Sequence, residues 1–378
     1  MISDMRLNAC CLLLIASLLA QPARAQPAWA GRLESALAEI DGRKGPRIGV
    51  YVRDLDTGES AGWRTDERWY LASTVKVPIA IAVMRGVERG AWTLDTPVIL
   101  HAGDYVDGAG STNRQPVGAQ IPVRKLMEQM IIYSDNTASD LLIGLAGIDA
   151  VNGVVKSLVP QGFGPITRLA DVRHAVYGGL APEATQLTGR TWLQLHALPG
   201  DAARLRQFSL LTGVPPASFR LPTLDAAYDS YYASGLNSAR LASYADLLQA
   251  LVEGRALDAA STRYLLGLMQ RVATGRHRVT DGLPPTVSFA HKTGTQRRRI
   301  CDSGIVSVAG DGPTPQRVVL VACARDEPSL PRAERALSQV ANALCRSGLI
   351  TKGVPDAPTC QADAGAGRLP ASSQRAVR

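Results

Sequence analysis

The chain has 378 residues, 46% of them hydrophobic, and a formal net charge of +8 at pH 7. This length and hydrophobic content suit one large domain, or two closely joined subdomains, with a substantial core. The basic residues are scattered, without a long basic run or interleaved aromatic residues, so the sequence gives no support for nucleic-acid binding.

The N-terminus has the pattern of a secretory signal peptide. Arg6 supplies a positive charge, residues 9–20 are apolar, and Ala23-Arg24-Ala25 is an A-x-A cleavage site. The apolar stretch is too short to span a bilayer. We therefore expect residues 1–25 to be removed, which leaves a periplasmic or secreted monomer without a stable membrane anchor.

Hydrophobic periodicity and turn residues predict the secondary structure in chain order. A helix at 29–40 precedes strands at 47–53 and 60–63, and a buried helix begins at Ser73. Helices are predicted at 126–133, 137–145, 241–254 and 260–272, strands at 286–291, 300–308 and 317–324, and a last helix at 330–345.

The predicted strands come from both ends of the chain, whereas the middle is helical. We expect an α/β fold of the α+β sandwich kind, in which an antiparallel sheet is flanked by helices and carries an inserted all-α subdomain. In one domain over 26–350, the sheet part comprises 26–70 and 255–350, and the helical part 71–254. Residues 351–378 are rich in Ala, Gly, Pro, Ser and Arg and are predicted to be a disordered tail.

Four cysteines remain after signal cleavage: Cys301, Cys323, Cys345 and Cys360. In an oxidising compartment they permit two disulfides, with three pairings, or else four buried thiols. Cys301 and Cys323 lie at matching distances from a Gly-Asp-Gly-Pro turn between two strands, so an antiparallel hairpin places them opposite each other. Cys345 would then pair with Cys360 and tie the tail to the last helix.

Two polar residues, Ser73 and Lys76, interrupt the otherwise apolar start of the buried helix. They are one helical turn apart and therefore project from the same face. Burial lowers the pKa of a lysine, and a neutral amine beside a hydroxyl is a base beside a nucleophile. The alternative is a serine helix cap followed by a lysine that reaches solvent.

Two further motifs favour the catalytic interpretation: Ser134-Asp135-Asn136 between two predicted helices, and Lys292-Thr293-Gly294 after a predicted strand. S-x-x-K, S-D-N and K-T-G in this order are typical of class A β-lactamases and penicillin-binding proteins. The chain resembles this family over nearly its whole mature length, apart from its central stretch. The resemblance implies the same architecture, with the site in a cleft between the two parts.

By this resemblance, four residues would carry acyl transfer. Ser73 would be the nucleophile and Lys76 its base. Ser134 would relay a proton to the leaving nitrogen, and Lys292 would place a positive charge near Ser134 and the substrate carboxylate. No cofactor is expected.

The resemblance also implies the binding residues. Asn136 would bind Lys76 and a substrate amide, and Thr293 and Thr295 would bind the substrate carboxylate. Gly294 lets the substrate approach the strand closely. The backbone N–H groups of Ser73 and Thr295 would form the oxyanion hole.

The chain departs from the family after Thr167-Arg168-Leu169, where class A enzymes carry a glutamate and an asparagine that position the deacylating water. Neither is present, and a longer stretch near 175–236 follows, which is predicted to fold and either to cover the cleft or to bind a protein. Asp171 is the better candidate for a substitute base than Glu183, but its position favours a structural role, as a helix cap or a partner for Arg168 or Arg173.

Three more residue sets have alternative interpretations. Arg297-Arg298-Arg299 is either a solvated turn or a second anion contact for a carboxylate-bearing substrate. His291 precedes Lys292 and, by strand alternation, faces away from it, so we expect a structural role. The histidines lack paired metal-ligand spacing, and we expect no metal.

Three functions remain open from the sequence. The first is a class A-like β-lactamase with an altered water-activating loop. The second is a D-Ala-D-Ala peptidase, amidase or esterase acting on peptidoglycan fragments. The third is a binder that senses β-lactams or muropeptides without turnover, which a complete proton-transfer set disfavours. The expected partner is a small β-lactam or a D-Ala-D-Ala-type peptide.

Overall fold

The structure is a computed structural model that describes residues 26–310, 312 and 314–360. The predicted signal peptide, 1–25, and the predicted tail from residue 361 onward lie outside the described residues. Residues 351–360, also assigned to the tail, form turns. The disulfide Cys345–Cys360 ties these turns to the last helix.

Five antiparallel strands form the main sheet in the order β2-β1-β9-β8-β7, as predicted for the sheet part. Their bounds are β1 (Arg47–Asp54), β2 (Ser60–Trp63), β7 (Val287–Gln296), β8 (Arg299–Val308) and β9 (Gln316–Arg325). Strand β7 lies at one edge and continues beyond its predicted end at residue 291, so Lys292-Thr293-Gly294 belongs to the strand. Cys301 and Cys323 are directly opposite each other and form the predicted disulfide.

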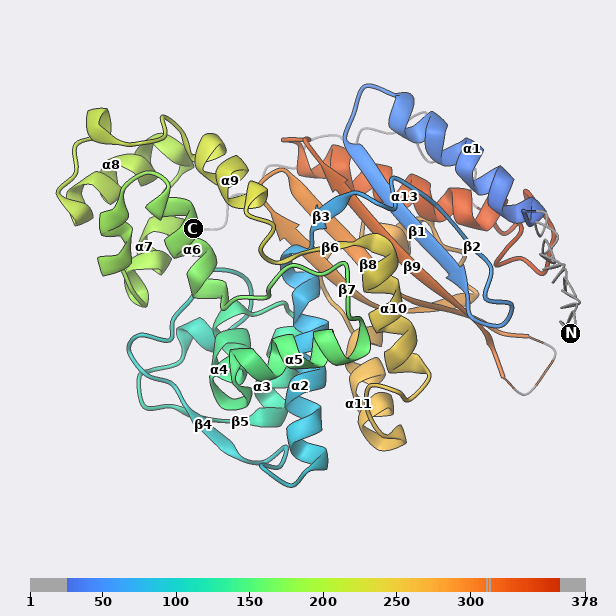
Figure 1. The fold of residues 1–378 in the computed structure, drawn as a ribbon, viewed down its shortest axis with the longest axis horizontal. Helices are drawn as coiled ribbons and strands as arrows, with labels where there is room; N and C mark the ends of the chain where they lie inside the picture. The colour runs from blue at the N-terminus through green and yellow to red at the C-terminus, as the bar shows by residue number, and fades with distance from the viewer. Residues whose placement is uncertain (1–25, 311, 313, 361–378) are drawn as a thin grey trace, which may run out of the picture.

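One face of this sheet is covered by the two terminal helices, α1 (Ala28–Gly42) and α13 (Leu330–Arg346), which contact each other across it (Figure 1). Their apolar residues and those of the sheet form one continuous core. Leu33 and Leu37 of α1 and Leu337 and Leu344 of α13 are fully buried in it. The hydrophobic effect therefore joins the two ends of the chain into one layer.

The other face packs against the helical part, whose centre is α2 (Lys76–Glu88). Apolar residues surround α2 on every side, because it contacts α3, α4, α5 and α11. The surrounding helices are α3 (Val123–Ile132), α4 (Asn136–Ala146), α5 (Ile148–Leu158), α10 (Leu241–Val252) and α11 (Ala259–Gln270). Helix α11, which the sequence assigns to the sheet part, contacts β7 as well as α2 and α3.

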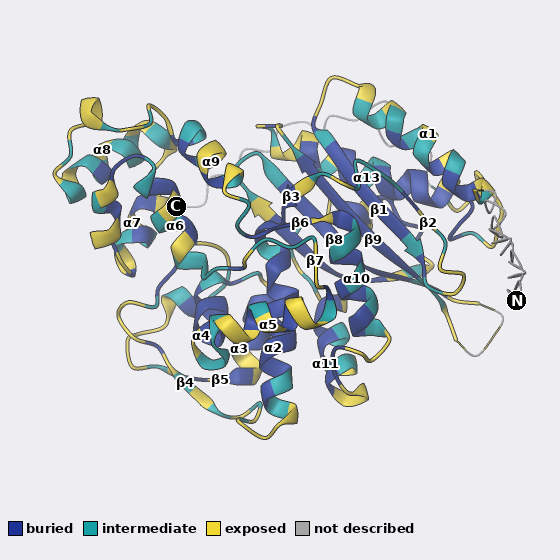
Figure 2. Cartoon of the chain, in the orientation of Figure 1, coloured by how far each residue is buried: buried dark blue, intermediate teal, exposed yellow. Residues whose placement is uncertain are grey.

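Residues 169–236, called the arm below, form a separate helical lobe at one end of the molecule (Figure 1). The arm contains α6 (Leu169–Gly178), η3 (Pro182–Gln186), α7 (Arg190–Ala197), α8 (Gly200–Thr212), η4 (Pro216–Ser218) and α9 (Leu224–Ala233). Its apolar residues form a third core cluster, which also includes Tyr70 and Ala72 beside the arm, and buried residues are visible within the arm (Figure 2). The arm begins before the predicted residue 175, because Val172 of α6 already belongs to this core.

Several short strands and one short helix were not predicted from the sequence, and they help to hold the arm, the helical part and the sheet in place. Strand β3 (Arg68–Tyr70) pairs with β6 (Ser238–Arg240), which brings the end of the arm back beside Ser73. A second small pair, β4 (Pro97–Ile99) and β5 (Gln120–Pro122), lies before α3, and α12 (Val279–Gly282) before β7.

Among the described residues, no single helix has the length and apolar composition needed to cross a membrane. Helices α4 and α5 reach that length and composition only when taken together, and they meet at a bend of 84°.

Candidate active site

Ser73 lies in η1 (Ala72–Val75), the 3₁₀ turn that leads into α2. The preceding Ala72 has a φ of +48°, a strained value for a non-glycine residue. Gly294 of β7 packs against this turn. A Cβ at Gly294 would lie 2.5 Å from the Leu71 carbonyl oxygen and 3.1 Å from the Ser73 nitrogen. A glycine is therefore required for β7 to approach the serine this closely.

Lys76 is fully buried at the start of α2. Its Nζ donates to the Ser134 carbonyl oxygen at 2.6 Å and to Asn136 Oδ1 at 2.7 Å, and lies 3.3 Å from Ser134 Oγ. Burial lowers the pKa of Lys76 to about 7, although Asp135 and Asp140 oppose the shift. A large share of this lysine is therefore a neutral amine near neutral pH.

Ser134 accepts a hydrogen bond from a second lysine, Lys292. The φ of Ser134 is +63°, and Lys292 Nζ donates to the serine Oγ at 3.0 Å and to the Thr293 carbonyl oxygen at 2.9 Å. Burial, and then the charges of Lys76 and Arg278, hold the pKa of Lys292 well below its usual range. The structure thus brings Ser73, Lys76, Ser134 and Lys292 to one place.

The four predicted binding residues also meet here. Asn136 begins α4 and faces Lys76, and Gly294 and Thr295 follow Thr293 along β7. The Thr293 hydroxyl is bonded to that of Thr274. The Thr295 hydroxyl accepts a hydrogen bond from Arg278 at 2.7 Å.

Arg278 is a site residue that the sequence did not reveal. Only 3% of it is exposed, and its guanidinium donates to the carbonyl oxygens of Gly294 and Cys301 and pairs with Glu334 at 3.1 Å. Through these hydrogen bonds Arg278 stabilises the end of β7 and places a positive charge beside Thr295. No spacing pattern marks it, because its partners are distant in the sequence.

Ser73, Ser134 and Asn136 open into a cavity of about 650 Å³ between β7, the helical part and the arm. This volume is within the range of small-molecule sites. The arm provides a largely aromatic and apolar wall, together with basic side chains: Val172, Arg173, Tyr177, Trp192, Leu195, His196, Arg204, Leu224 and Tyr228. The central stretch that lacks the family pattern thus forms one side of the site.

Two of the three arginines that follow β7 contact the arm. Arg297 pairs with Asp201 of α8 at 2.5 Å and with Asp225 of α9, and its carbonyl oxygen accepts the Tyr232 hydroxyl at 2.7 Å. Arg299 pairs with Asp326 at 2.8 Å.

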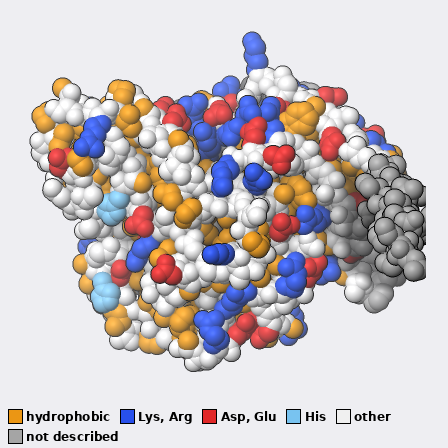
Figure 3. Space-filling view, viewed as in Figure 1, with side chains coloured by type: hydrophobic (Ala, Val, Ile, Leu, Met, Phe, Trp, Pro, Cys, Tyr) orange, Lys and Arg blue, Asp and Glu red, His pale blue; other side chains and the backbone are white. Residues whose placement is uncertain are grey.

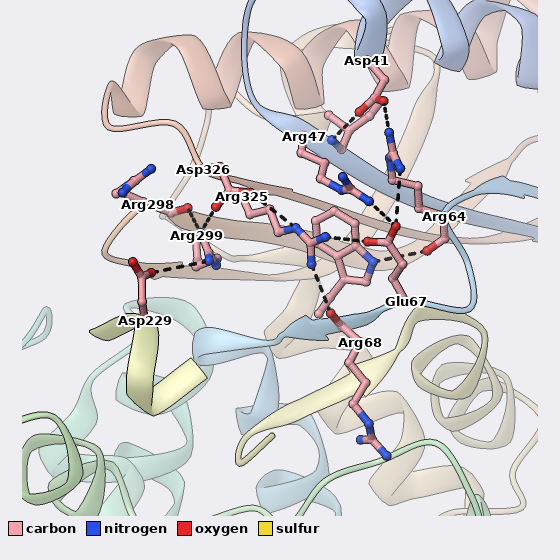
Figure 4. A network of polar contacts seen from close by, with 12 residues as sticks. Asp41, Arg47, Arg64, Glu67, Arg68, Asp229, Arg298, Arg299, Arg325 and Asp326 are labelled. Carbon is pink, nitrogen blue, oxygen red and sulfur yellow. Dashed lines mark hydrogen bonds and ion pairs between the residues drawn. The ribbon is translucent and has the colours of Figure 1, made fainter. Parts of the chain in front are cut away.

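The remaining contacts link the same arginines to α9. Arg299 lies 3.9 Å from Asp229 (Figure 4). Its guanidinium also stacks over the Tyr232 ring. Basic side chains gather in this region of the surface, over the strand ends (Figure 3). Arg297 and Arg299 thus fasten the arm to the sheet. All three arginines also line the cavity, so a contact with an anionic substrate stays a prediction.

The two carboxylates that the sequence offers as substitute bases, Asp171 and Glu183, lie outside the cavity. Asp171 is exposed and does not line the cavity. Its carboxylate accepts the backbone N–H of the N-cap residue Arg168 at 3.2 Å, as part of the capping box of α6. Glu183 does not line the cavity either.

Three carboxylates do line the cavity in the described part of the chain, and each is paired with an arginine. Asp107 pairs with Arg173, Asp225 with Arg297, and Glu327 with Arg332. A carboxylate paired in this way is a weak base, and the guanidinium of Arg173 holds the pKa of Asp107 far below its usual range against the effect of burial.

His291 is buried and bonded through Nδ1 to Asp302 at 2.6 Å, which fits the predicted structural role. No cluster of three or more potential metal ligands occurs among the described residues.

Comparison with known proteins identifies similar chains. Residues 32–347 match the sequence model of the beta-lactamase enzyme family. A β-lactamase of Streptomyces albus G is 34% identical over 190 residues, which are 47% of this chain and 59% of that protein. The chain spans about half the length of the curated relatives it matches first.

Solved structures are similar over more of the chain. The β-lactamase from Sphaerobacter thermophilus has a TM-score of 0.60 and 25% identity, and the match covers 85% of this chain and 98% of that one. PBP-A has a TM-score of 0.61 and 21% identity, and the match covers 83% and 94%. The fold is therefore the one that the resemblance implied.

Proposed function

Because the chain belongs to the beta-lactamase enzyme family, we propose that it is an exported serine hydrolase whose Ser73 forms an acyl-enzyme with β-lactams. The observation that carries this proposal is the convergence of Lys76 and Lys292 on the Ser134 hydroxyl beside Ser73. A buried lysine with a pKa of about 7 supplies a base at neutral pH.

The first step would be attack of Ser73 Oγ on the β-lactam carbonyl carbon. Lys76 in its neutral form takes the hydroxyl proton as the new C–O bond forms. The carbonyl oxygen gains negative charge, which the backbone N–H groups of Ser73 and Thr295 would stabilise as preorganised donors. The ring C–N bond then breaks.

The leaving nitrogen needs a proton. Ser134 would give its hydroxyl proton to that nitrogen and recover one from Lys76, so that the lysine ends neutral. The net result is the transfer of one proton from Ser73 to the ring nitrogen, which stays attached to the acyl group. Lys292, bonded to Ser134 at 3.0 Å, would stabilise the serine oxygen as the proton leaves. Every proton in the acylation step is thereby accounted for.

Substrate binding would use the strand and the loop after α3. The carboxylate of a penicillin would lie against Thr293, Thr295 and Lys292, with Arg278 behind them. Asn136 would contact the acyl amide. Because Gly294 has no side chain, the substrate can lie directly along β7.

The paired carboxylates favour slow hydrolysis of this acyl-enzyme. Each carboxylate that lines the cavity in the described residues is engaged by an arginine, so a strong base for water is not available from them. This observation favours a second candidate function, that of a D-Ala-D-Ala peptidase or amidase inhibited by β-lactams. A PBP-A variant, similar in fold, is known as an acyl-enzyme complex with penicillin G.

Intact-mass spectrometry with benzylpenicillin over time tests the proposal and separates the two candidates. An adduct that disappears quickly with product formation supports a β-lactamase, and a persistent adduct supports the peptidase or a non-hydrolysing sensor. Peptide mapping should locate the adduct on Ser73, and Ser73→Ala should remove it. Labelling that survives Ser73→Ala would refute the assignment.

Export is a separate part of the proposal. The chain would lose residues 1–25, and the mature protein would be one domain over 26–350, of which the arm is an insertion. N-terminal sequencing of the protein recovered from the periplasm or medium should begin at Gln26. Retention of the first 25 residues would contradict it.

A further inference from the structure

The arm places one buried cation in the site. Arg173 of α6 forms a two-pronged ion pair with Asp107, from Nε to Oδ1 at 2.6 Å and from Nη2 to Oδ2 at 2.9 Å. The side chains of Arg173 and Asp107 are 12% and 4% exposed. A buried pair of this geometry holds its partner in one orientation, and its rupture leaves an uncompensated charge.

Asp107 connects this pair to the catalytic lysine through its backbone. Its carbonyl oxygen accepts Asn136 Nδ2 at 2.6 Å, and Asn136 Oδ1 accepts Lys76 Nζ at 2.7 Å. The next residue, Gly108, packs closely against the same amide: a Cβ at this position would lie only 2.5 Å from Asn136 Nδ2. The orientation of Asn136 therefore depends on where residues 107 and 108 are held.

Lys76 also interacts electrostatically with Arg173 and with the charged residues around it. Lys76 faces Asp135 and Asp140 on the α4 side, Lys292 on β7 and Arg173 on the arm. The two aspartates favour its charged form, whereas the cation of Arg173 opposes it. Other titratable groups also face the pair: His196 of α7 lies 3.0 Å from Asp107, and Tyr70 and Tyr228 interact electrostatically with Arg173.

We propose that Arg173 is a positioning residue for acylation, which fixes Asn136 and Lys76 through Asp107 and so makes the arm a necessary part of the active site. This inference rests on the proposed function. The sequence predicts that the arm covers the cleft or binds a protein; Arg173 instead gives it a role in positioning the acylation groups.

Two substitutions separate geometry from charge. Arg173→Lys keeps the positive charge but cannot hold both carboxylate oxygens at once. Arg173→Gln loses both. We expect each variant to acylate Ser73 roughly tenfold to 100-fold more slowly, the scale expected when a reacting group is misplaced by about 1 Å.

The effect of the Arg173 charge on Lys76 is measured by titrating Lys76 by NMR in the absence of substrate. The chain has only six lysines, so ¹³C-lysine labelling gives few resonances, and Lys76 is assigned by its loss in Lys76→Met. We expect its titration midpoint to be higher in Arg173→Gln, since a neighbouring cation is removed, and close to the wild-type value in Arg173→Lys.

The control is Arg206→Ala, which removes an exposed arginine of the same arm that does not line the cavity. Acylation and melting temperature are measured for all four proteins, and the titrations are repeated with His196→Gln to remove its titration. Arg173→Gln that folds, acylates at the wild-type rate and leaves the Lys76 midpoint unchanged would overturn the inference. If wild-type protein is not acylated but the Lys76 midpoint still moves in Arg173→Gln, the coupling is supported and only the proposed function fails.

Discussion

Lys76 and Lys292 donate to the same hydroxyl oxygen, Ser134 Oγ, from the start of α2 and from the edge strand β7. Burial disfavours the charged form of both lysines, and the charge of Lys76 further disfavours that of Lys292. The pKa values of both lysines are accordingly lowered. Lys76 lies one turn from Ser73 at the start of α2, and we therefore propose Lys76, in its neutral form, as the base for Ser73.

The acylation rate should depend on pH through Lys76. Its pKa is about 7, and the neutral form is the base, so the rate should rise as the pH increases through about 7 and fall about tenfold per unit below it. Stopped-flow acylation by a chromogenic cephalosporin from pH 5 to 9 measures this profile. A rate independent of pH across that range would contradict the role of Lys76.

Replacement of Lys76 by Met should reduce acylation by about 10²–10⁴-fold, the usual contribution of a general base. It should also change the pH dependence of stability. Unfolded Lys76 binds a proton up to its ordinary pKa of 10.5, whereas the folded protein releases it near 7, so this lysine makes the free energy of unfolding increase with pH between those values.

The slope contributed by one proton is about 1.4 kcal/mol per pH unit. In Lys76→Met this contribution should disappear, and urea denaturation of both proteins at pH 7.5, 8.5 and 9.5 measures the difference. Equal slopes would show that Lys76 is charged in the folded protein.

The sequence was informative where chemistry is local. Ser73 and Lys76 are one turn apart, and Ser134 and Asn136 share a loop, so motif and periodicity were sufficient to propose them together. The hairpin also placed Cys301 opposite Cys323, and the structure confirms that disulfide.

The arm contacts were not predictable in this way. Arg173 and Asp107 are 66 residues apart, and Arg297 and Asp201 are 96 apart, with no periodic pattern that links them. Strands β3 and β6 contain three residues each, too few to show an alternating pattern. Such contacts arise only once the separate cores of the arm and the sheet are packed against each other.

Arg297→Ala should loosen the arm without unfolding the protein. Partly exposed ion pairs contribute about 0.2–1 kcal/mol each, and Arg297 makes two with the arm. We expect amide exchange in α8 and α9 to accelerate about two- to 30-fold, while the global stability changes by less than about 2 kcal/mol. Hydrogen exchange with mass spectrometry measures both, and Arg206→Ala is the matched control. Unchanged exchange in α8 and α9 would show that Arg297 does not fasten the arm.

Removal of the buried disulfide should destabilise the sheet. Cys301 and Cys323 are each 1% exposed and close a loop with a sequence separation of 22. The double variant Cys301→Ala/Cys323→Ala should lose about 2–4 kcal/mol of unfolding free energy. Urea denaturation measures the loss. A change below about 0.5 kcal/mol would mean that the cross-strand packing alone holds β8 to β9.

The last prediction concerns deacylation. Since the carboxylates that line the cavity are paired with arginines, penicillin hydrolysis should show a burst near one product per enzyme, followed by slow turnover. Asp171 is exposed and caps α6, so Asp171→Asn should leave the slow phase unchanged.

A carboxylate placed on the cavity wall should accelerate that phase. Of the two residues after Arg168, Leu169 lines the cavity and Ala170 does not. Leu169→Glu should therefore raise steady-state turnover at least about tenfold while the burst amplitude is kept, because general-base assistance is worth about 10²–10⁴-fold when well aligned. Leu169→Gln, which has the same shape without the charge, is the control. A wild-type enzyme with fast, burst-free hydrolysis would mean that another group already activates the water.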